Sequence, residues 1–251
     1  MNTPITHQFT FDSCITAEQK AFYEYYGFIH FRHLLTGYEL SVLETMLSKV
    51  YDHVLKVQPE KINGIPIRYG QDEYGAPIVQ RLPHTAAFNK EIAALLMNKG
   101  IASLAALTNR PDCRLGFDEK DGLVTNYFIN TPGSTYRQMG WHTDGLRELL
   151  LLQPLLPMIN VGFYLDDSGI SNGGLRIIPG SHRSGLAGMF LRKMHLLDKN
   201  HDEREFCITA SKGDMVLHDG RLWHRVALSP QTGKNSRRRV MYAPLVCGKE
   251  A

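Results

Sequence analysis

The chain has 251 residues, of which 43% are apolar, and this is enough to bury one sizeable core. Its 28 basic and 25 acidic residues are scattered and give a net charge of only +3, which speaks against nucleic-acid binding. No apolar run reaches the roughly 20 residues of a membrane span, and residues 1–16 lack the apolar core of a signal peptide. We therefore expect a cytoplasmic protein without membrane or nucleic-acid partners.

Two capping-box patterns mark helix starts near the N-terminus. Thr16 is followed by Gln19, and Thr36 by Glu39, in the arrangement that satisfies the first free backbone amides of a helix. After the second pattern, apolar residues recur at helical spacing and predict an amphipathic helix over residues 37–57. The apolar stripe of this helix, which should pack against a sheet, consists of Leu40, Leu43, Leu47, Val50 and Val54.

A short third helix is predicted over residues 89–98, and further along the chain the pattern changes to strands. Short runs rich in β-branched and aromatic residues alternate with Gly, Pro, Asn and Asp turns. Helices first and antiparallel strands afterwards predict one domain over residues 1–251, with a helical buttress (about 16–100) and a double-stranded β-helix, a cupin-like jelly-roll barrel (about 120–248). The predicted strands cover residues 123–129, 159–165, 175–178, 215–217 and 240–245.

Two connections are long for a compact domain. They cover residues 145–157 and 183–205, and long loops beside a site commonly act as lids.

The four cysteines are widely separated and form no C-x-x-C pair, which favours free thiols in a reducing compartment over a disulfide framework or a zinc site. They are Cys14, Cys113, Cys207 and Cys247.

The triplet His142-Thr143-Asp144 is the strongest chemical signal in the sequence. Two imidazoles and one carboxylate can hold Fe(II) on one face and leave the opposite positions open. Side chains two apart on an extended segment point the same way, so His142 and Asp144 can bind one ion from a single strand end. A distant strand must supply the third ligand, and His218 and His224 are both candidates. The triplet alone is equally compatible with a solvated turn.

The neighbours of the triplet make the signal more specific. The order and spacing of four segments together are far more specific than any one segment. The segments are residues 141–144, 172–182, 213–224 and 238–241. On these segments the chain resembles the phytanoyl-CoA dioxygenase family of Fe(II)- and 2-oxoglutarate-dependent oxygenases, and the likeness extends along nearly the whole chain. Residues 22–35, a helix that runs into an apolar segment, are also similar to the beginning of family members.

The resemblance implies that His142, Asp144 and His224 bind Fe(II), while His218 belongs to the core. It implies O2 and 2-oxoglutarate as co-substrates, and hydroxylation of an unactivated C–H bond of a small-molecule metabolite with release of succinate and CO2. Desaturation or another oxidative tailoring reaction of the same class is the alternative. Halogenating relatives replace the carboxylate ligand by a small residue, so Asp144 argues against halogenation.

The far carboxylate of 2-oxoglutarate requires a guanidinium in a partly dry pocket. Strand alternation turns Arg238 inward with residues 240 and 242, so we prefer Arg238 and keep Arg239 as the alternative. Many family members place a hydroxyl residue two positions after the distal histidine, but this chain has Val226 there. We therefore expect another group, on the strand that precedes the triplet, to share the carboxylate with the arginine. The candidates are Tyr136, Gln138 and Asn126, although Gln and Asn residues near strand ends more often have a structural role.

Arg147 and Arg176 flank the predicted mouth of the barrel. We expect them to contact the small-molecule substrate, an anionic one in particular, although arginines of this kind are more often surface charges. A non-redox, cupin-like metal-binding protein and a barrel that acts only as an interaction module are the rival classes. Oxygen consumption coupled to 2-oxoglutarate distinguishes the first class from the other two. The oligomeric state is left as monomer or homodimer.

Overall fold

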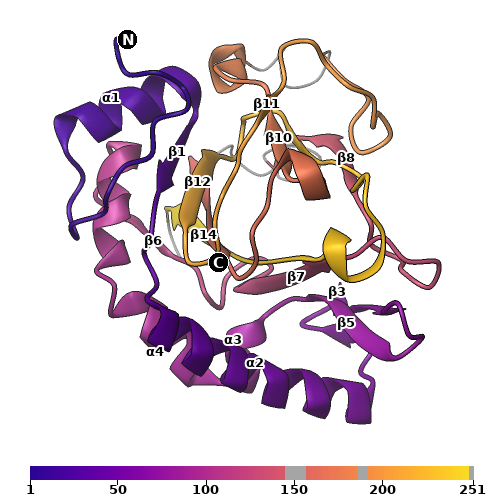
Figure 1. The fold of residues 1–251 in the computed structure, drawn as a ribbon. Coiled ribbons are helices and arrows are strands. Elements are labelled where there is room, and N and C mark those ends of the chain that lie inside the picture. The colour runs from indigo at the N-terminus through magenta and orange to yellow at the C-terminus, as the bar shows by residue number, and fades with distance from the viewer. Residues whose placement is uncertain (145–156, 186–191, 249–251) are drawn as a thin grey trace.

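Two antiparallel sheets face each other in the computed structural model, which describes residues 1–144, 157–185 and 192–248 (Figure 1). The larger sheet has the strand order β1-β12-β9-β14-β7-β5-β4, with β6 paired to β14, and the smaller sheet has the order β11-β10-β13-β8. Most buried apolar side chains of the two sheets belong to one large core cluster, and Trp141 of the smaller sheet packs in a second, small cluster with Ile178 and Trp223. This arrangement is the predicted jelly roll, and the fold prediction is confirmed.

The strands of the larger sheet are β1 (Phe28–Phe31), β4 (Arg68–Gln71), β5 (Pro77–Leu82), β6 (Cys113–Leu115), β7 (Val124–Phe128), β9 (Met158–Tyr164), β12 (Met215–Asp219) and β14 (Arg238–Cys247). Those of the smaller sheet are β8 (Met139–His142), β10 (Leu175–Ile177), β11 (Phe206–Cys207) and β13 (His224–Val226). A separate hairpin consists of β2 (Lys61–Ile62) and β3 (Ile65–Pro66).

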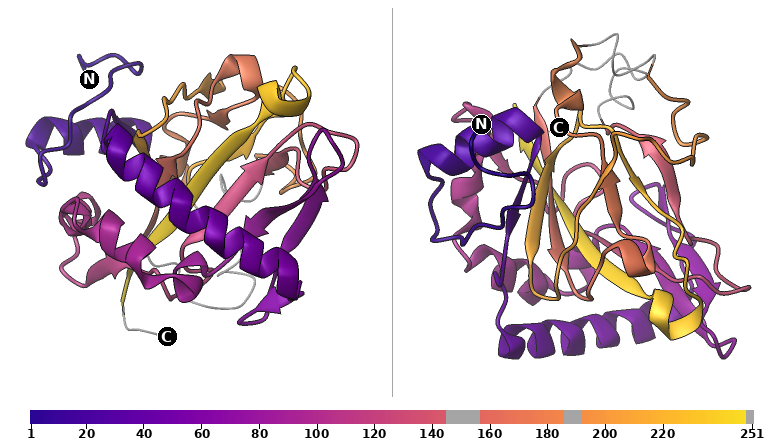
Figure 2. Two further views of the ribbon diagram at one scale, coloured as in Figure 1. Left: turned by 60° about the horizontal axis from the view of Figure 1, so that its bottom comes forward. Right: turned by 45° about the horizontal axis from the view of Figure 1, so that its top comes forward.

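The α-helices are α1 (Ala17–Tyr26), α2 (Gly37–Val57), α3 (Thr85–Phe88) and α4 (Lys90–Met97), and the 3-10 helices are η1 (Ile101–Thr108), η2 (Ile170–Asn172), η3 (Ser181–Arg183) and η4 (Gly233–Ser236). Both predicted capping boxes are present, at the starts of α1 and α2. The five predicted apolar residues of α2 are its buried residues, and α2 lies across the outside of the larger sheet (Figure 2).

The N-terminal part is more than a helical buttress. Strands β1, β4 and β5 lie within residues 16–100 and extend the larger sheet, with β1 at one end and β4 at the other. All four residues of β1 are buried, because the strand pairs with β12 on one side and α1 covers it. A four-residue apolar run of this kind has no alternation that would separate a strand from a buried helix segment.

The expectation of four free thiols is wrong. Cys113 and Cys247 form a disulfide, and only Cys14 and Cys207 are free. The two bonded cysteines stand opposite each other in the β6–β14 pair, with 4.0 Å between their Cα atoms. They are separated by 134 residues along the chain, so only the pairing of the two strands reveals that the thiols meet.

The turn before β12 is held by a buried carboxylate. Asp214 accepts hydrogen bonds from the His33 and Ser211 backbone amides at 2.9 and 2.8 Å and lies 2.8 Å from His30 Nε2. Gly213 has φ +93°, and a Cβ there would lie 2.8 Å from the Leu35 carbonyl oxygen, so a side chain does not fit. The Gly-Asp pair therefore fixes the point at which β12 begins.

Asp214→Asn should destabilise the fold by about 1.5–3 kcal/mol at pH 7, because these hydrogen bonds to a charged group are lost. Burial alone would raise the pKa of Asp214, but the hydrogen bonds from His30, His33 and Ser211 lower it below its ordinary value. A carboxyl group whose pKa is lower in the folded than in the unfolded protein contributes its full stabilisation above the unfolded pKa of about 4. This contribution disappears as the pH falls through the folded pKa. Urea unfolding at pH 7 and pH 3 checks this prediction. The difference in the free energy of unfolding between wild type and variant should be smaller at pH 3 than at pH 7, and an equal difference at the two pH values contradicts the prediction.

Both predicted lid loops fall partly outside the described residues, which exclude 145–156 and 186–191. The described part of the second loop lies along β8, where the Trp141 amide donates to the Asp198 carbonyl at 2.8 Å.

Within the described ranges no single helix has the length and apolar character needed to cross a membrane, and only the bent pair of α4 and η1 meets these criteria jointly.

Candidate metal centre

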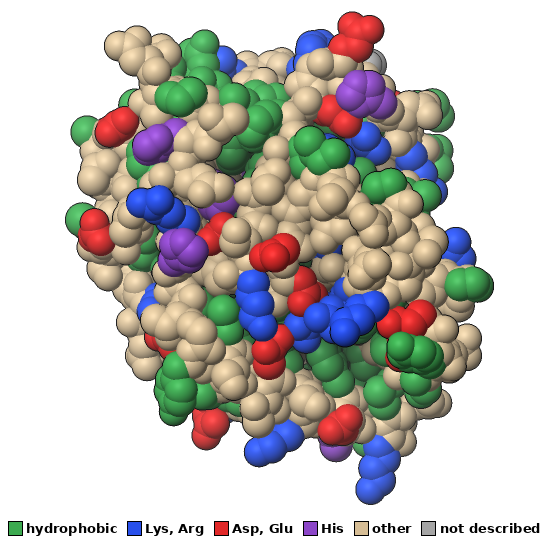
Figure 3. Space-filling view, in the orientation of Figure 1, with side chains coloured by type: hydrophobic (Ala, Val, Ile, Leu, Met, Phe, Trp, Pro, Cys, Tyr) green, Lys and Arg blue, Asp and Glu red, His purple; other side chains and the backbone are tan. Residues whose placement is uncertain are grey.

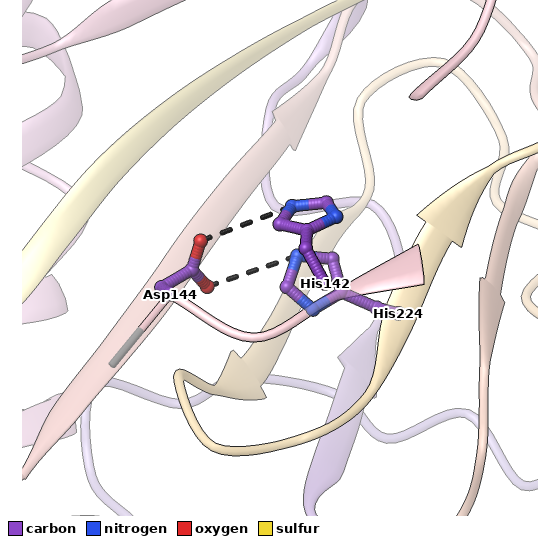
Figure 4. Close-up of side chains that lie close together, drawn as sticks. All are labelled: His142, Asp144 and His224. Carbon is purple, nitrogen blue, oxygen red and sulfur yellow. Dashed lines mark ion pairs between the residues drawn. The ribbon is translucent and has the colours of Figure 1, made fainter. Parts of the chain in front are cut away.

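His142, Asp144 and His224 converge inside the barrel (Figure 4). His142 ends β8, Asp144 follows two residues later, and His224 begins the neighbouring strand β13, where it pairs directly with His142. The Nε2 atoms of the two histidines lie 3.9 and 3.7 Å from the carboxylate oxygens of Asp144. One potential ligand atom from each residue lies within 4.8 Å of the other two, so a single ion could contact all three.

The two imidazoles are oriented so that each presents an unprotonated nitrogen. His142 Nδ1 lies 2.8 Å from the Gly140 carbonyl oxygen, and His224 Nδ1 lies 2.9 Å from the Leu222 carbonyl oxygen. A carbonyl oxygen only accepts, so both Nδ1 atoms carry the proton and both Nε2 atoms keep a lone pair. Burial lowers the pKa of His142 to about 3 and that of His224 to about 4, so both rings are neutral at neutral pH. This donor set fits a divalent metal ion.

Asn160, a residue that the sequence did not single out, holds the carboxylate in place. Its Nδ2 donates to Asp144 Oδ2 at 2.6 Å and lies 3.3 Å from His218 Nε2. The carboxylate requires a donor, so the amide nitrogen faces it and the second amide hydrogen points to His218. His218 lies 3.9 Å from Asp144 Oδ2 but outside the three-residue cluster. His218 therefore lies beside the metal centre, in contact with Asn160, and is not one of the three candidate ligands.

Asn160→Ala should lower metal affinity by about 10- to 100-fold, the usual effect of losing a partner that orients a ligand. The remaining three side chains still bind the ion, but one oxygen of Asp144 loses its hydrogen bond. Titration of the metal-free protein with Co(II), followed by absorbance, measures the dissociation constant. An unchanged constant would show that the Asn160 contact contributes packing alone.

Arg238, the first residue of β14, is only 3% exposed. Its guanidinium donates to the carbonyl oxygens of Asn172, of Ala227 at 3.2 Å and of Arg137 at 3.3 Å. Burial lowers its pKa to about 10, so it stays charged at neutral pH. Its Nε has no hydrogen-bond partner, and no carboxylate in the described ranges forms an ion pair with it. A buried cation without a counter-ion fits an anionic ligand.

The neighbouring arginines are already paired. Arg239 contacts Asp166 at 2.8 Å and Glu44 of α2 at 2.6 Å, and Arg237 contacts Asp166 at 3.2 Å. Arg239 therefore links α2 to the larger sheet through these two carboxylates. Strand alternation explains the difference from Arg238, because successive residues of β14 face opposite sides of the sheet.

The three residues expected to assist the carboxylate have different surroundings. Tyr136 stacks on Phe128 with ring centroids 4.5 Å apart, and its hydroxyl lies 3.6 Å from the Met139 sulfur. Asn126 pairs with Val240 across β7 and β14 and therefore faces the interior, where its Oδ1 has no partner among the described residues. Gln138 is half-buried just before β8.

Of the two predicted substrate arginines, only Arg176 lies within the described residues, and the structure does not bring it to the metal centre. Arg147 lies outside the described residues. Arg176 lies on the outer side of the smaller sheet, because its neighbour Leu175 faces the barrel interior, and its Nε is 3.9 Å from Glu205. Arg225 also pairs with Glu205, at 2.8 Å. On the face shown in Figure 3, positive and negative side chains lie beside one another in this way.

A jelly roll with two histidines and one carboxylate at its open end defines a class of metal-dependent proteins. The model of the phytanoyl-CoA dioxygenase (PhyH) family matches residues 23–238, and the chain belongs to this family. It is 27% identical over 258 aligned positions to the phytanoyl-CoA dioxygenase domain-containing protein 1 homolog of Dictyostelium discoideum, which covers 89% of this chain and 88% of that protein.

Solved structures share the fold. EvdO2 from Micromonospora carbonacea var. aurantiaca, complexed with 2-oxoglutarate, superposes with a TM-score of 0.65 at 15% identity and covers 94% of this chain and 93% of that one. HygX from Streptomyces hygroscopicus, with nickel and 2-oxoglutarate bound, gives 0.63 at 16% identity over 93% and 87% of the two chains. The carbocyclase SnoK from nogalamycin biosynthesis gives 0.62 at 16% identity over 93% and 84%.

Proposed function

We propose that this protein is an Fe(II)- and 2-oxoglutarate-dependent oxygenase that hydroxylates an unactivated C–H bond of a small-molecule metabolite, with succinate and CO2 as co-products. The observation that carries the proposal is the combination of the His142, Asp144 and His224 cluster with the unpaired, buried cation of Arg238 on the same barrel interior. Family membership and the ligands of EvdO2 and HygX support the same reading.

Each part of the site has a defined task. His142, Asp144 and His224 would hold the iron, and a site with these three ligands would keep positions for the 2-oxo acid and O2. The bound iron supplies the oxygen activation, while the protein fixes the geometry and excludes water. Arg238, the first residue of β14, would hold the far carboxylate. Four residues further along the same strand, the ring of Tyr242 lies 5.9 Å from that of His218, beside the metal ligands.

The outcome at the substrate carbon is the open part of the proposal. Among the structures with this fold are a carbocyclase, SnoK, and an epimerase, SnoN, both α-ketoglutarate dependent. Desaturation or rearrangement is therefore the alternative outcome within the same class. The prime substrate is a small molecule. The expected preference for an anionic substrate loses the support of Arg176, because this side chain faces away from the barrel interior.

Oxygen consumption and succinate release test the proposal. The Fe(II)-loaded protein should consume O2 and produce succinate only when 2-oxoglutarate is present, and a library of small molecules should contain compounds that accelerate both. Product mass then distinguishes hydroxylation, a gain of one oxygen, from desaturation, a loss of two hydrogens. A protein that binds iron but never produces succinate would instead be a non-redox metal-binding protein.

A further inference from the structure

The peptide group that joins Thr143 to Asp144 is held from two sides. It lies between the candidate ligands His142 and Asp144, so its orientation sets how the two side chains stand relative to each other. The Asp144 amide donates to the Gly220 carbonyl oxygen at 2.7 Å, in the turn between β12 and β13. The Thr143 carbonyl oxygen lies 3.1 Å from His195 Nε2. A carbonyl oxygen only accepts, so His195 Nε2 carries the proton and donates.

His195 belongs to residues 192–205, a segment that we call the strap because it follows the edge of β8. Strand β8 stands at one end of the smaller sheet, next to β13. The Leu196 amide donates to the Trp141 carbonyl oxygen at 2.7 Å. A Cβ on Gly140 would collide with the Leu196 carbonyl group, so only glycine allows this close approach. The strap therefore reaches the end of β8 at the point where the metal ligands begin.

Charged side chains fasten the strap to the outer face of the smaller sheet. Trp141 precedes a ligand on β8 and therefore faces the outer side. Lys193 Nζ and the Arg225 guanidinium lie 5.5 and 5.3 Å from the centre of its ring, within the range of cation–π contacts. Lys193 also pairs with Asp202 at 3.1 Å, and Arg225 pairs with Glu205 at 2.8 Å. These contacts hold the strap, and with it His195, beside the metal centre.

We infer that His195 is a positioning residue of the metal centre, which holds the Thr143 carbonyl oxygen so that Asp144 stays directed at the ion. His195 lies outside the three-residue cluster, and its ring centre is 6.0 Å from that of His142, so it acts through the peptide and is not a ligand. The inference rests on the proposed function, because it assumes that a metal ion occupies the cluster, but it does not depend on 2-oxoglutarate.

Two substitutions at position 195 separate the hydrogen bond from packing. The metal-free, full-length protein is titrated with Co(II), whose visible absorption reports both affinity and the geometry of the ligands. His195→Leu removes the donor and should weaken Co(II) binding by about 10-fold, the lower end of the usual loss for an outer partner of a metal site. The shape of the absorption bands should change as well. His195→Gln keeps a donor nitrogen at a similar distance from the backbone and should restore the wild-type affinity and bands.

His201→Leu is the matched control. His201 lies on the same strap and pairs with Glu205 at 2.8 Å, but its side chain is 70% exposed, so Co(II) affinity should stay at the wild-type value. Circular dichroism checks that each variant is folded. Unchanged affinity and bands in His195→Leu overturn the inference, as does an equal loss in His195→Gln or in His201→Leu. A wild-type protein that binds no Co(II) overturns the metal site of the proposed function itself.

Discussion

Asp144→Ala is expected to weaken Fe(II) binding by more than about 100-fold and to abolish succinate formation. The variant loses one of three protein ligands, and a direct ligand should matter more than the outer partners, whose loss costs 10- to 100-fold. The fold should survive, because the Asp144 side chain is part of the open end of the barrel and is 23% exposed. Metal titration of the purified variant, with circular dichroism to check the fold, measures both effects.

His224→Ala should lose the metal in the same way, whereas His218→Ala should keep most of it. His224 belongs to the three-residue cluster, while His218 contacts Asp144 through Asn160. Asp118→Ala, at an exposed position, is the control and should bind metal like the wild type. If His218→Ala lost the metal and His224→Ala retained it, the assignment of the third ligand would be wrong.

Arg238→Lys should raise the dissociation constant of 2-oxoglutarate strongly, and Arg238→Ala should raise it further. A point charge does not reproduce a planar guanidinium, and a buried carboxylate left without its partner costs on the order of 2–5 kcal/mol. Fe(II) affinity should change little, because Arg238 is not one of the metal ligands. Titration of the iron-loaded variants with 2-oxoglutarate under argon gives the constants.

The same substitutions at Arg237 are the control. Arg237 is more exposed than Arg238 and pairs with Asp166, so Arg237→Ala should change 2-oxoglutarate affinity by less than about 0.5 kcal/mol. Arg239→Ala should mainly destabilise the fold, because it breaks the contacts to Asp166 and Glu44. A larger loss of affinity at Arg239 than at Arg238 would transfer the anchoring role to Arg239.

Much of the fold follows from local signals. Capping residues and apolar periodicity predicted α2 with its bounds and its buried face, since both depend on residues within one or two turns. Long-range pairing left no such signal. The disulfide between Cys113 and Cys247 and the addition of β1 to the edge of the larger sheet depend on strands that are distant in the sequence.

The site divides in the same way. The spacing of His142 and Asp144 indicated a shared metal because two residues on one strand end point together. Arg238 could be preferred over Arg239 by strand alternation alone. Asn160 left no comparable signal, because an asparagine within an apolar strand is ordinary until the register of β9 against β12 is known. The outward position of Arg176 likewise depends on which face of β10 is buried.

Anaerobic titration of the wild-type protein with Fe(II) and then 2-oxoglutarate is the decisive experiment for this site. We expect a weak metal-to-ligand charge-transfer band that saturates at one 2-oxoglutarate per protein and is absent in Asp144→Ala. In Arg238→Ala the band should require much more 2-oxoglutarate. A wild-type protein that binds Fe(II) without developing this band, or a band that persists unchanged in both variants, would contradict the assignment of the site.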